Sequence, residues 1–113
     1  MAEDKNFLEK LGITGYFDNS CPKGWEKLVT DLIIDITNMG WDRNLSQVKE
    51  KYGGLRFYIG SATDEVFERI DQAETDSESI CQFCGDVAEL RDFNGWYITL
   101  CDKCFVKESK RRK

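Results

Sequence analysis

The chain places four of its five cysteines in two Cys-x-x-Cys pairs, at residues 81–84 and 101–104. Sixteen residues separate the pairs, a spacing typical of zinc sites. Each pair can form a knuckle, a tight turn whose two thiolates bind one side of an ion, and Gly85 suits the turn after the first pair. We therefore expect a closed tetrahedral site with Zn–S distances of ~2.3 Å. The expected ligands are Cys81, Cys84, Cys101 and Cys104.

The segment between the two pairs has the pattern of a β-hairpin. Residues 88–93 and 96–100 are strand-like, and Asn94-Gly95 between them is the strongest two-residue hairpin signal. An antiparallel hairpin returns the chain to its starting end, so both knuckles meet there. We predict a C-terminal zinc ribbon over residues 81–106. Because so short a segment has almost no core, the metal should supply most of its folding free energy.

Three alternatives to a zinc site remain open. Four thiolates also suit a single iron ion, although the second knuckle lacks the glycine and proline of rubredoxin-like sites. Two disulfides would require an exported protein, whereas the charged N-terminus without an apolar signal core leads us to expect a reducing cytoplasm. A redox pair of the thioredoxin type would need a single Cys-x-x-Cys between a strand and a helix.

The remaining residues offer little for catalysis. The chain contains no histidine, so Cys21, which lies outside the two pairs, lacks the usual base of a catalytic cysteine. Carboxylate pairs such as Asp64 and Glu65 fall on a helix face predicted to be exposed. The Gly53-Gly54 pair lacks the lysine and Ser/Thr of a phosphate-binding loop. We expect a protein without enzymatic activity and Cys21 as a spectator thiol.

The sequence patterns before the first cysteine pair predict an α+β domain over residues 1–80, whose elements must position the pairs. Residues 3–11 are predicted to form a short helix. Residues 25–39 form a longer amphipathic helix, with one wide apolar stripe ended by Gly40. The stripe consists of Trp25, Leu28, Val29, Leu32, Ile33, Ile36 and Met39.

A period of two between Leu45 and Ile59 predicts two strands, with Gly53-Gly54 as the turn of a hairpin that packs on the helix over residues 25–39. A third helix over about residues 63–79 starts at Thr63, whose side chain can cap it. Its predicted inner stripe is Val66, Phe67, Ile70, Ala73, Ser77 and Ile80. Its predicted outer side carries Asp64, Glu68, Asp71 and Thr75.

Charge is distributed unevenly along the chain. The net charge is −5, but residues 61–80 hold seven acids against Arg69 alone. This balance argues against a general polyanion binder, because phosphate neutralisation drives most non-specific nucleic-acid affinity. No apolar run approaches the ~20 residues needed to span a bilayer. The basic residues 107–113 are predicted to be a solvated tail.

The motif QVKEKYGGLRFYIG at residues 47–60 is preceded by Gly24-Trp25 and followed by an acidic helix and a CxxCG…GW..TLC pattern. Over about residues 23–104, the chain resembles an uncharacterised family of small proteins encoded in phages, prophages and bacterial genomes. Members of that family often end the metal motif in His, where this chain has Cys104. The resemblance implies a single module with a zinc site and supplies no established activity.

Two binding functions follow from these patterns. In the first, the outer side of the third helix (Asp64, Glu68, Asp71 and Thr75) binds a protein partner with a basic surface. Such a protein would be a cytoplasmic, phage-encoded modulator or inhibitor of a host machine or defence system. In the second, the ribbon binds nucleic acid. The residues for this second function are Arg91, Lys103, Lys107 and the basic tail, with Trp96 or Tyr97 stacking on bases.

Overall fold

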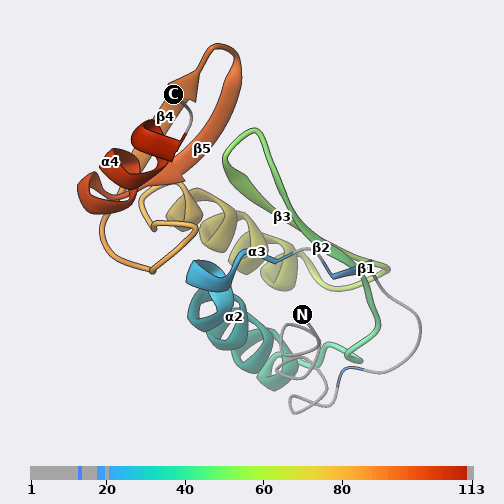
Figure 1. Cartoon of the computed structure of the whole chain (residues 1–113). Helices are drawn as coiled ribbons and strands as arrows, with labels where there is room; N and C mark the ends of the chain where they lie inside the picture. The colour runs from blue at the N-terminus through green and yellow to red at the C-terminus, as the bar shows by residue number, and fades with distance from the viewer. Residues whose placement is uncertain (1–12, 14–17, 20, 112–113) are drawn as a thin grey trace.

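A computed structural model describes residues 13, 18–19 and 21–111 (Figure 1). The expected α+β class is confirmed. The helix predicted over residues 3–11 lies outside the described residues. In chain order the elements are β1 (Asp18–Asn19), the 3₁₀ turn η1 (Lys23–Trp25), α2 (Glu26–Asn38), β2 (Leu45–Lys51), β3 (Gly54–Ile59), α3 (Asp64–Ser77), β4 (Glu89–Phe93), β5 (Trp96–Leu100) and α4 (Asp102–Arg111).

Helix α2 carries the apolar stripe predicted for residues 25–39. Its buried residues are Val29, Leu32, Ile33 and Ile36. Trp25 precedes the helix in η1 and is fully buried. The prediction was wrong for Met39, which is 45% exposed because it follows the last helical turn, where Gly40 (φ 104°) redirects the chain.

The β2–β3 hairpin turns one residue earlier than predicted. Lys51 pairs with Gly54 in the antiparallel register, so the turn consists of Tyr52 and Gly53 rather than the two glycines. Both turn residues have positive φ, 53° and 83°, as a two-residue turn matched to the strand twist requires. Gly54 is therefore the first residue of β3.

Two details of this sheet were not predicted. The short strand β1 pairs in parallel with β2 and extends the sheet to the order β1-β2-β3. The register of β2 against β3 shifts between Leu45 and Gln47. Because a shift of this kind breaks the strict alternation of side chains, Leu45 and Val48 are both buried although they are three residues apart.

Helix α3 packs on β3 and lies beside α2 (Figure 1). The side chain of Thr63 accepts a hydrogen bond from the backbone N–H of Val66, which confirms the predicted cap. Two expectations need correction. Phe67, assigned to the inner stripe, is 41% exposed. The helix that lies directly against the hairpin is α3, while α2 packs on α3 and shares one apolar core with the sheet.

The C-terminal part consists of the loop that carries Cys81 and Cys84, the β4–β5 hairpin and α4. Asn94 and Gly95 form its turn with φ of 55° and 93°, as predicted. Helix α4 extends to Arg111, so residues 107–111 are helical rather than part of a solvated tail. The ring of Phe105 on α4 lies 5.6 Å from that of Phe93 on β4, which packs the helix on the hairpin. No helix in the described part of the chain has the length and apolar character needed to cross a membrane.

Candidate metal centre

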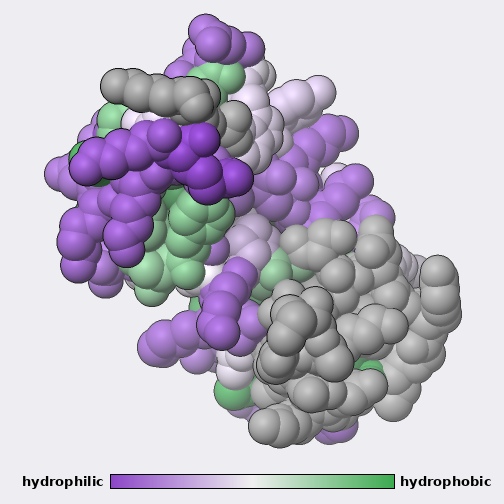
Figure 2. All heavy atoms as spheres, viewed as in Figure 1, coloured by the Kyte–Doolittle hydropathy of each residue, from purple (hydrophilic) through white to green (hydrophobic). Residues whose placement is uncertain are grey.

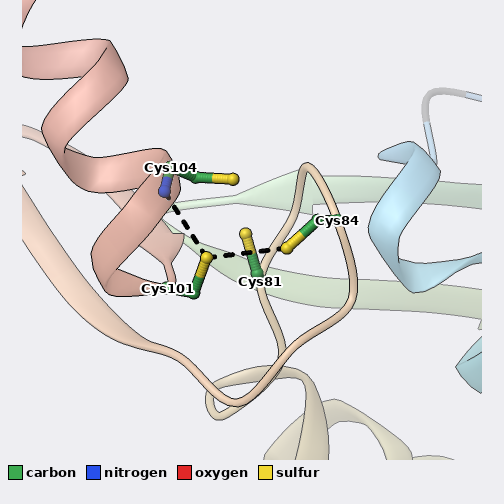
Figure 3. Close-up of side chains that lie close together, drawn as sticks. All are labelled: Cys81, Cys84, Cys101 and Cys104. Atoms are coloured by element: carbon green, nitrogen blue, oxygen red, sulfur yellow. Dashed lines mark hydrogen bonds between the residues drawn. The ribbon is translucent and has the colours of Figure 1, made fainter.

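Four separate positions of the C-terminal part supply the cysteines. Cys81 and Cys84 lie in the loop between α3 and β4. Cys101 directly follows β5, and Cys104 lies in the first turn of α4. The hairpin thus returns the chain to its starting end, as the sequence predicts, and the four side chains point toward one another (Figure 3).

The sulfur atoms are close enough to share one ion. All four Sγ atoms lie within 4.8 Å of one another. The Sγ atoms of Cys84 and Cys101 are 3.5 Å apart. Sulfur atoms at ~2.3 Å from a tetrahedral Zn²⁺ ion lie ~3.8 Å apart, so the cluster needs only small adjustments to accept the metal. Among the described residues, this is the one group of His, Cys, Asp or Glu side chains with such geometry.

Backbone hydrogen bonds shape the first knuckle. The N–H of Cys81 donates to the carbonyl of Asp86 at 2.8 Å, and the N–H of Gly85 donates to the carbonyl of Cys81 at 3.0 Å. Gly85 has φ of 88°, a conformation that glycine adopts without strain. In the second knuckle, the N–H of Cys104 lies 3.5 Å from the Sγ of Cys101 (Figure 3). Both pairs therefore form the expected tight turns.

The four thiols influence one another's protonation. Burial raises the pKa of Cys81, but hydrogen bonds from backbone N–H groups of both knuckles outweigh burial and lower this pKa to about 7. Burial, followed by hydrogen bonds with the neighbouring cysteines, raises the pKa of Cys104 to about 12. The metal-free cluster therefore keeps Cys104 protonated at neutral pH. Coordination of a metal ion by all four sulfur atoms would release that proton, because only the thiolate is a ligand.

The donor set can hold a soft divalent cation in a closed site. Four thiolates in a tetrahedron suit Zn²⁺ or a single iron ion. With all four positions taken by protein sulfur, such a site stabilises structure and leaves no coordination position for a substrate. The local core is small, as expected for so short a segment. It consists of Cys81, Ile98, Leu100 and Cys101, with Ala88, Phe93, Cys104 and Phe105 packed against them.

Two buried polar residues beside the cysteines were missed by sequence reasoning. The N–H of Gln82 donates to the carbonyl of Thr99 at 2.9 Å, and the N–H of Thr99 donates to Oε1 of Gln82 at 2.8 Å. This reciprocal pair ties the first knuckle to β5, next to Cys101. Polar residues that flank cysteines carry no periodic signal, so nothing in the sequence marks this pair as buried.

Arg91, predicted as a nucleic-acid contact, is engaged within the protein instead. Its guanidinium donates to the carboxylate of Asp102 at 2.7 Å and to the carbonyl of Leu100 at 3.1 Å. The same group stacks over the ring of Phe105, 4.3 Å from the ring centroid. Its side chain is only 14% exposed. Arg91 therefore joins α4 to the hairpin near Cys101, and a phosphate would have to break these contacts to reach it.

The other predicted binding residues lie on the surface. Asp64, Glu68, Asp71 and Thr75 are all exposed on α3, as expected for its outer side. Lys103 and Lys107 are exposed on α4, beside the half-exposed Val106. Trp96 and Tyr97 are 43% and 37% exposed. The acidic residues predicted to bind a protein therefore lie on α3, and the lysines predicted to bind nucleic acid lie on α4.

Cys21 and Cys84 differ in their access to solvent. Cys21 is buried in the main core, with its Sγ 3.3 Å from the carbonyl oxygen of Pro22, and is not part of the cluster. Cys84 is the exposed member of the four. It borders a hollow of about 720 Å³ between the start of α2 and the first knuckle.

In Figure 2, hydrophobic surface is visible beside α4 on the side that faces α2, within an otherwise largely hydrophilic face.

Comparisons with family models, with curated proteins and with solved structures found no match for this chain.

Proposed function

We propose that this protein binds one Zn²⁺ ion through Cys81, Cys84, Cys101 and Cys104, and that the ion is structural. The observation that carries this proposal is the convergence of four Sγ atoms within 4.8 Å of one another from two knuckles. Zinc is favoured over iron because the second knuckle continues directly into α4 and has no glycine after Cys104, unlike the paired knuckles of rubredoxin-like sites.

We further propose that the protein acts by binding another protein, without turnover. The outer side of α3 supports this, since its acids are exposed and residues 61–80 carry a net charge of −6. An acidic surface attracts a basic partner and speeds their association. This attraction weakens as salt screens the charges. The resemblance to phage and prophage proteins suggests a modulator or inhibitor of a host machine or defence system, active in the host cytoplasm.

Nucleic-acid binding is the second candidate function. It is favoured by the basic side of α4, where Lys103 and Lys107 flank Val106, and by the exposure of Trp96 and Tyr97 on the neighbouring hairpin. It is weakened by the engagement of Arg91 with Asp102 and Phe105. The protein-binding proposal is preferred because the chain is acidic as a whole, with a net charge of −5.

The experiment that separates these functions starts with affinity purification from the native host and mass spectrometry of the proteins retained. Association of the retained partner is then measured with the variant E68K/D71K and with the matched variant K103E/K107E. Both pairs are exposed and lie on one helix each. The proposal predicts that E68K/D71K slows association at low salt, whereas K103E/K107E does not.

The same two variants are tested for retention of DNA and RNA at two salt concentrations. Salt-dependent nucleic-acid binding that is lost in K103E/K107E, together with unchanged partner association in E68K/D71K, would contradict the protein-binding proposal and favour the second function.

A further inference from the structure

The first knuckle is held by two residues from the opposite end of the described chain. The indole Nε1 of Trp25 donates to the carbonyl of Ile80 at 2.8 Å. The backbone N–H of Gly24 donates to the carbonyl of Gln82, also at 2.8 Å. These two carbonyls belong to the residues on either side of Cys81. The carbonyl of Ile80 belongs to the peptide group just before Cys81, and that of Gln82 to the peptide group one residue further on, so η1 holds the backbone before and after Cys81.

Gly24 lies against the knuckle more closely than any other residue type permits. A Cβ atom at this position would lie 2.0 Å from the carbonyl oxygen of Cys81 and 2.8 Å from that of Gln82. Both neighbours are backbone atoms of the knuckle, so no side-chain rotation relieves the overlap. On the other side, a Cβ at Gly85 would lie 3.2 Å from the carbonyl oxygen of Gly24. The η1 turn and the first knuckle are thus in direct backbone contact.

Trp25 also connects this contact to the main core. It is fully buried and belongs to the cluster formed by α2, α3 and the sheet. Its ring packs in that core while its N–H reaches the residue before Cys81. Because α2 begins immediately after it, the position of the first knuckle is set by the packing of the α+β domain.

We propose that Gly24 and Trp25 are positioning residues of the metal centre. They hold the backbone on both sides of Cys81, so that its Sγ faces the other three sulfur atoms before the ion arrives. Groups that orient metal ligands in this way typically change metal affinity by about 10- to 100-fold when they are lost. The proposal rests on zinc binding by the four cysteines and extends it to residues that do not touch the ion.

Tryptophan-to-phenylalanine substitutions at two positions provide a matched test. W25F removes the donor to Ile80 but keeps an aromatic ring in the core. W41F removes a similar volume from the same core, since Trp41 is 5% exposed. It breaks no hydrogen bond within the described part of the chain, where the Nε1 of Trp41 has no partner. Zinc affinity is measured for each full-length protein by competition with a chelator of known affinity, and the Co²⁺ spectrum reports tetrahedral sulfur coordination.

The proposal predicts that W25F lowers zinc affinity about tenfold or more and that W41F changes it much less. Equal affinity of W25F and wild type would overturn it, as would an equal loss in both variants, since the loss would then reflect general destabilisation. Absence of zinc or Co²⁺ binding by the wild type is a different result. It would overturn the proposed metal function and the positioning role that rests on it.

A measurement on the unmodified chain keeps the proposal testable even where W25F does not fold. Because coupling between two sites is reciprocal, removal of zinc should loosen the contact between Trp25 and the knuckle. Hydrogen exchange of the two indole N–H groups is followed by NMR with and without zinc. Chelation is expected to accelerate exchange by a larger factor at Trp25 than at Trp41, and unchanged exchange at Trp25 would contradict the proposal.

Discussion

The hydroxyl of Thr99 donates to the carbonyl oxygen of Gly53 at 2.6 Å, and both residues are buried. Thr99 lies in β5, two residues before Cys101, and Gly53 lies in the turn of the β2–β3 hairpin. The bond therefore joins the cysteine-bearing hairpin to the α+β domain at a second point, separate from the contact of Trp25 with Ile80. The two hairpins approach each other at this point (Figure 1). Two hydrogen-bonded contacts therefore join the C-terminal part to the α+β domain.

Replacing Thr99 with Val should lower the free energy of unfolding by about 1–3 kcal/mol, because the buried carbonyl of Gly53 loses its donor. The matched control is T37V. Among the residues that the structure describes, the buried Oγ1 of Thr37 has no hydrogen-bond partner, so removing it should leave stability unchanged or raise it. Urea denaturation of the zinc-loaded proteins measures the free energy of unfolding of both variants. Equal midpoints for T99V and T37V would show that the contact between Thr99 and Gly53 does not stabilise the fold.

Leu32 tests the core of the α+β domain. It is fully buried on α2, so L32D places a charge among apolar side chains and should lower the free energy of unfolding by more than about 4 kcal/mol. Ile34 lies on the same helix and is 45% exposed, so I34D should cost less than about 1 kcal/mol. Thermal unfolding, monitored by circular dichroism, compares the stability of the two variants. A melting temperature of L32D equal to that of I34D would mean that the packing of α2 is assigned incorrectly.

Zinc affinity should fall as the pH is lowered from about 8 to about 6. Cys104, with its pKa of about 12 in the metal-free cluster, carries a proton throughout this range and must release it to bind. Each proton released contributes about a tenfold loss of affinity per pH unit. Cys81, with its pKa of about 7, adds to the slope once the pH falls below that value. Chelator competition at several pH values measures this dependence, and a flat profile would contradict coordination by thiols that are protonated before binding.

The convergence of the four cysteines could be predicted from the sequence because its determinants are local. The two-residue spacing inside each pair and the Asn94-Gly95 turn act over a few residues, and both behave as expected. The helices over residues 26–38 and 64–77 were also predicted, since their buried positions repeat with the helical period. Which of the two helices lies directly against the β2–β3 hairpin was not predicted, because periodicity identifies a buried face but does not say which element covers it.

The features that sequence reasoning missed include local features without a periodic signal and contacts between distant segments. The sequence of helix α4 shows no apolar stripe. A buried position on this helix is occupied by Glu108, whose carboxylate pairs with Arg111. Gly24 and Trp25 stand more than fifty residues before Cys81, so nothing local links them to the knuckle. The turn at Tyr52 and Gly53 was displaced by one residue because a non-glycine residue adopts positive φ there. Of these features, the contacts of Gly24 and Trp25 with the first knuckle are decided by tertiary packing.

The most direct test of the account is the zinc content of the purified full-length protein, measured by elemental analysis beside the variants C104S and C21S. The account predicts about one zinc per chain for the wild type. C104S should lose most of this zinc, since Cys104 is one of the four converging ligands. C21S should retain all of it, since Cys21 is buried in the main core away from the cluster. Iron in place of zinc, or no metal with all thiols reduced, would contradict the central claim.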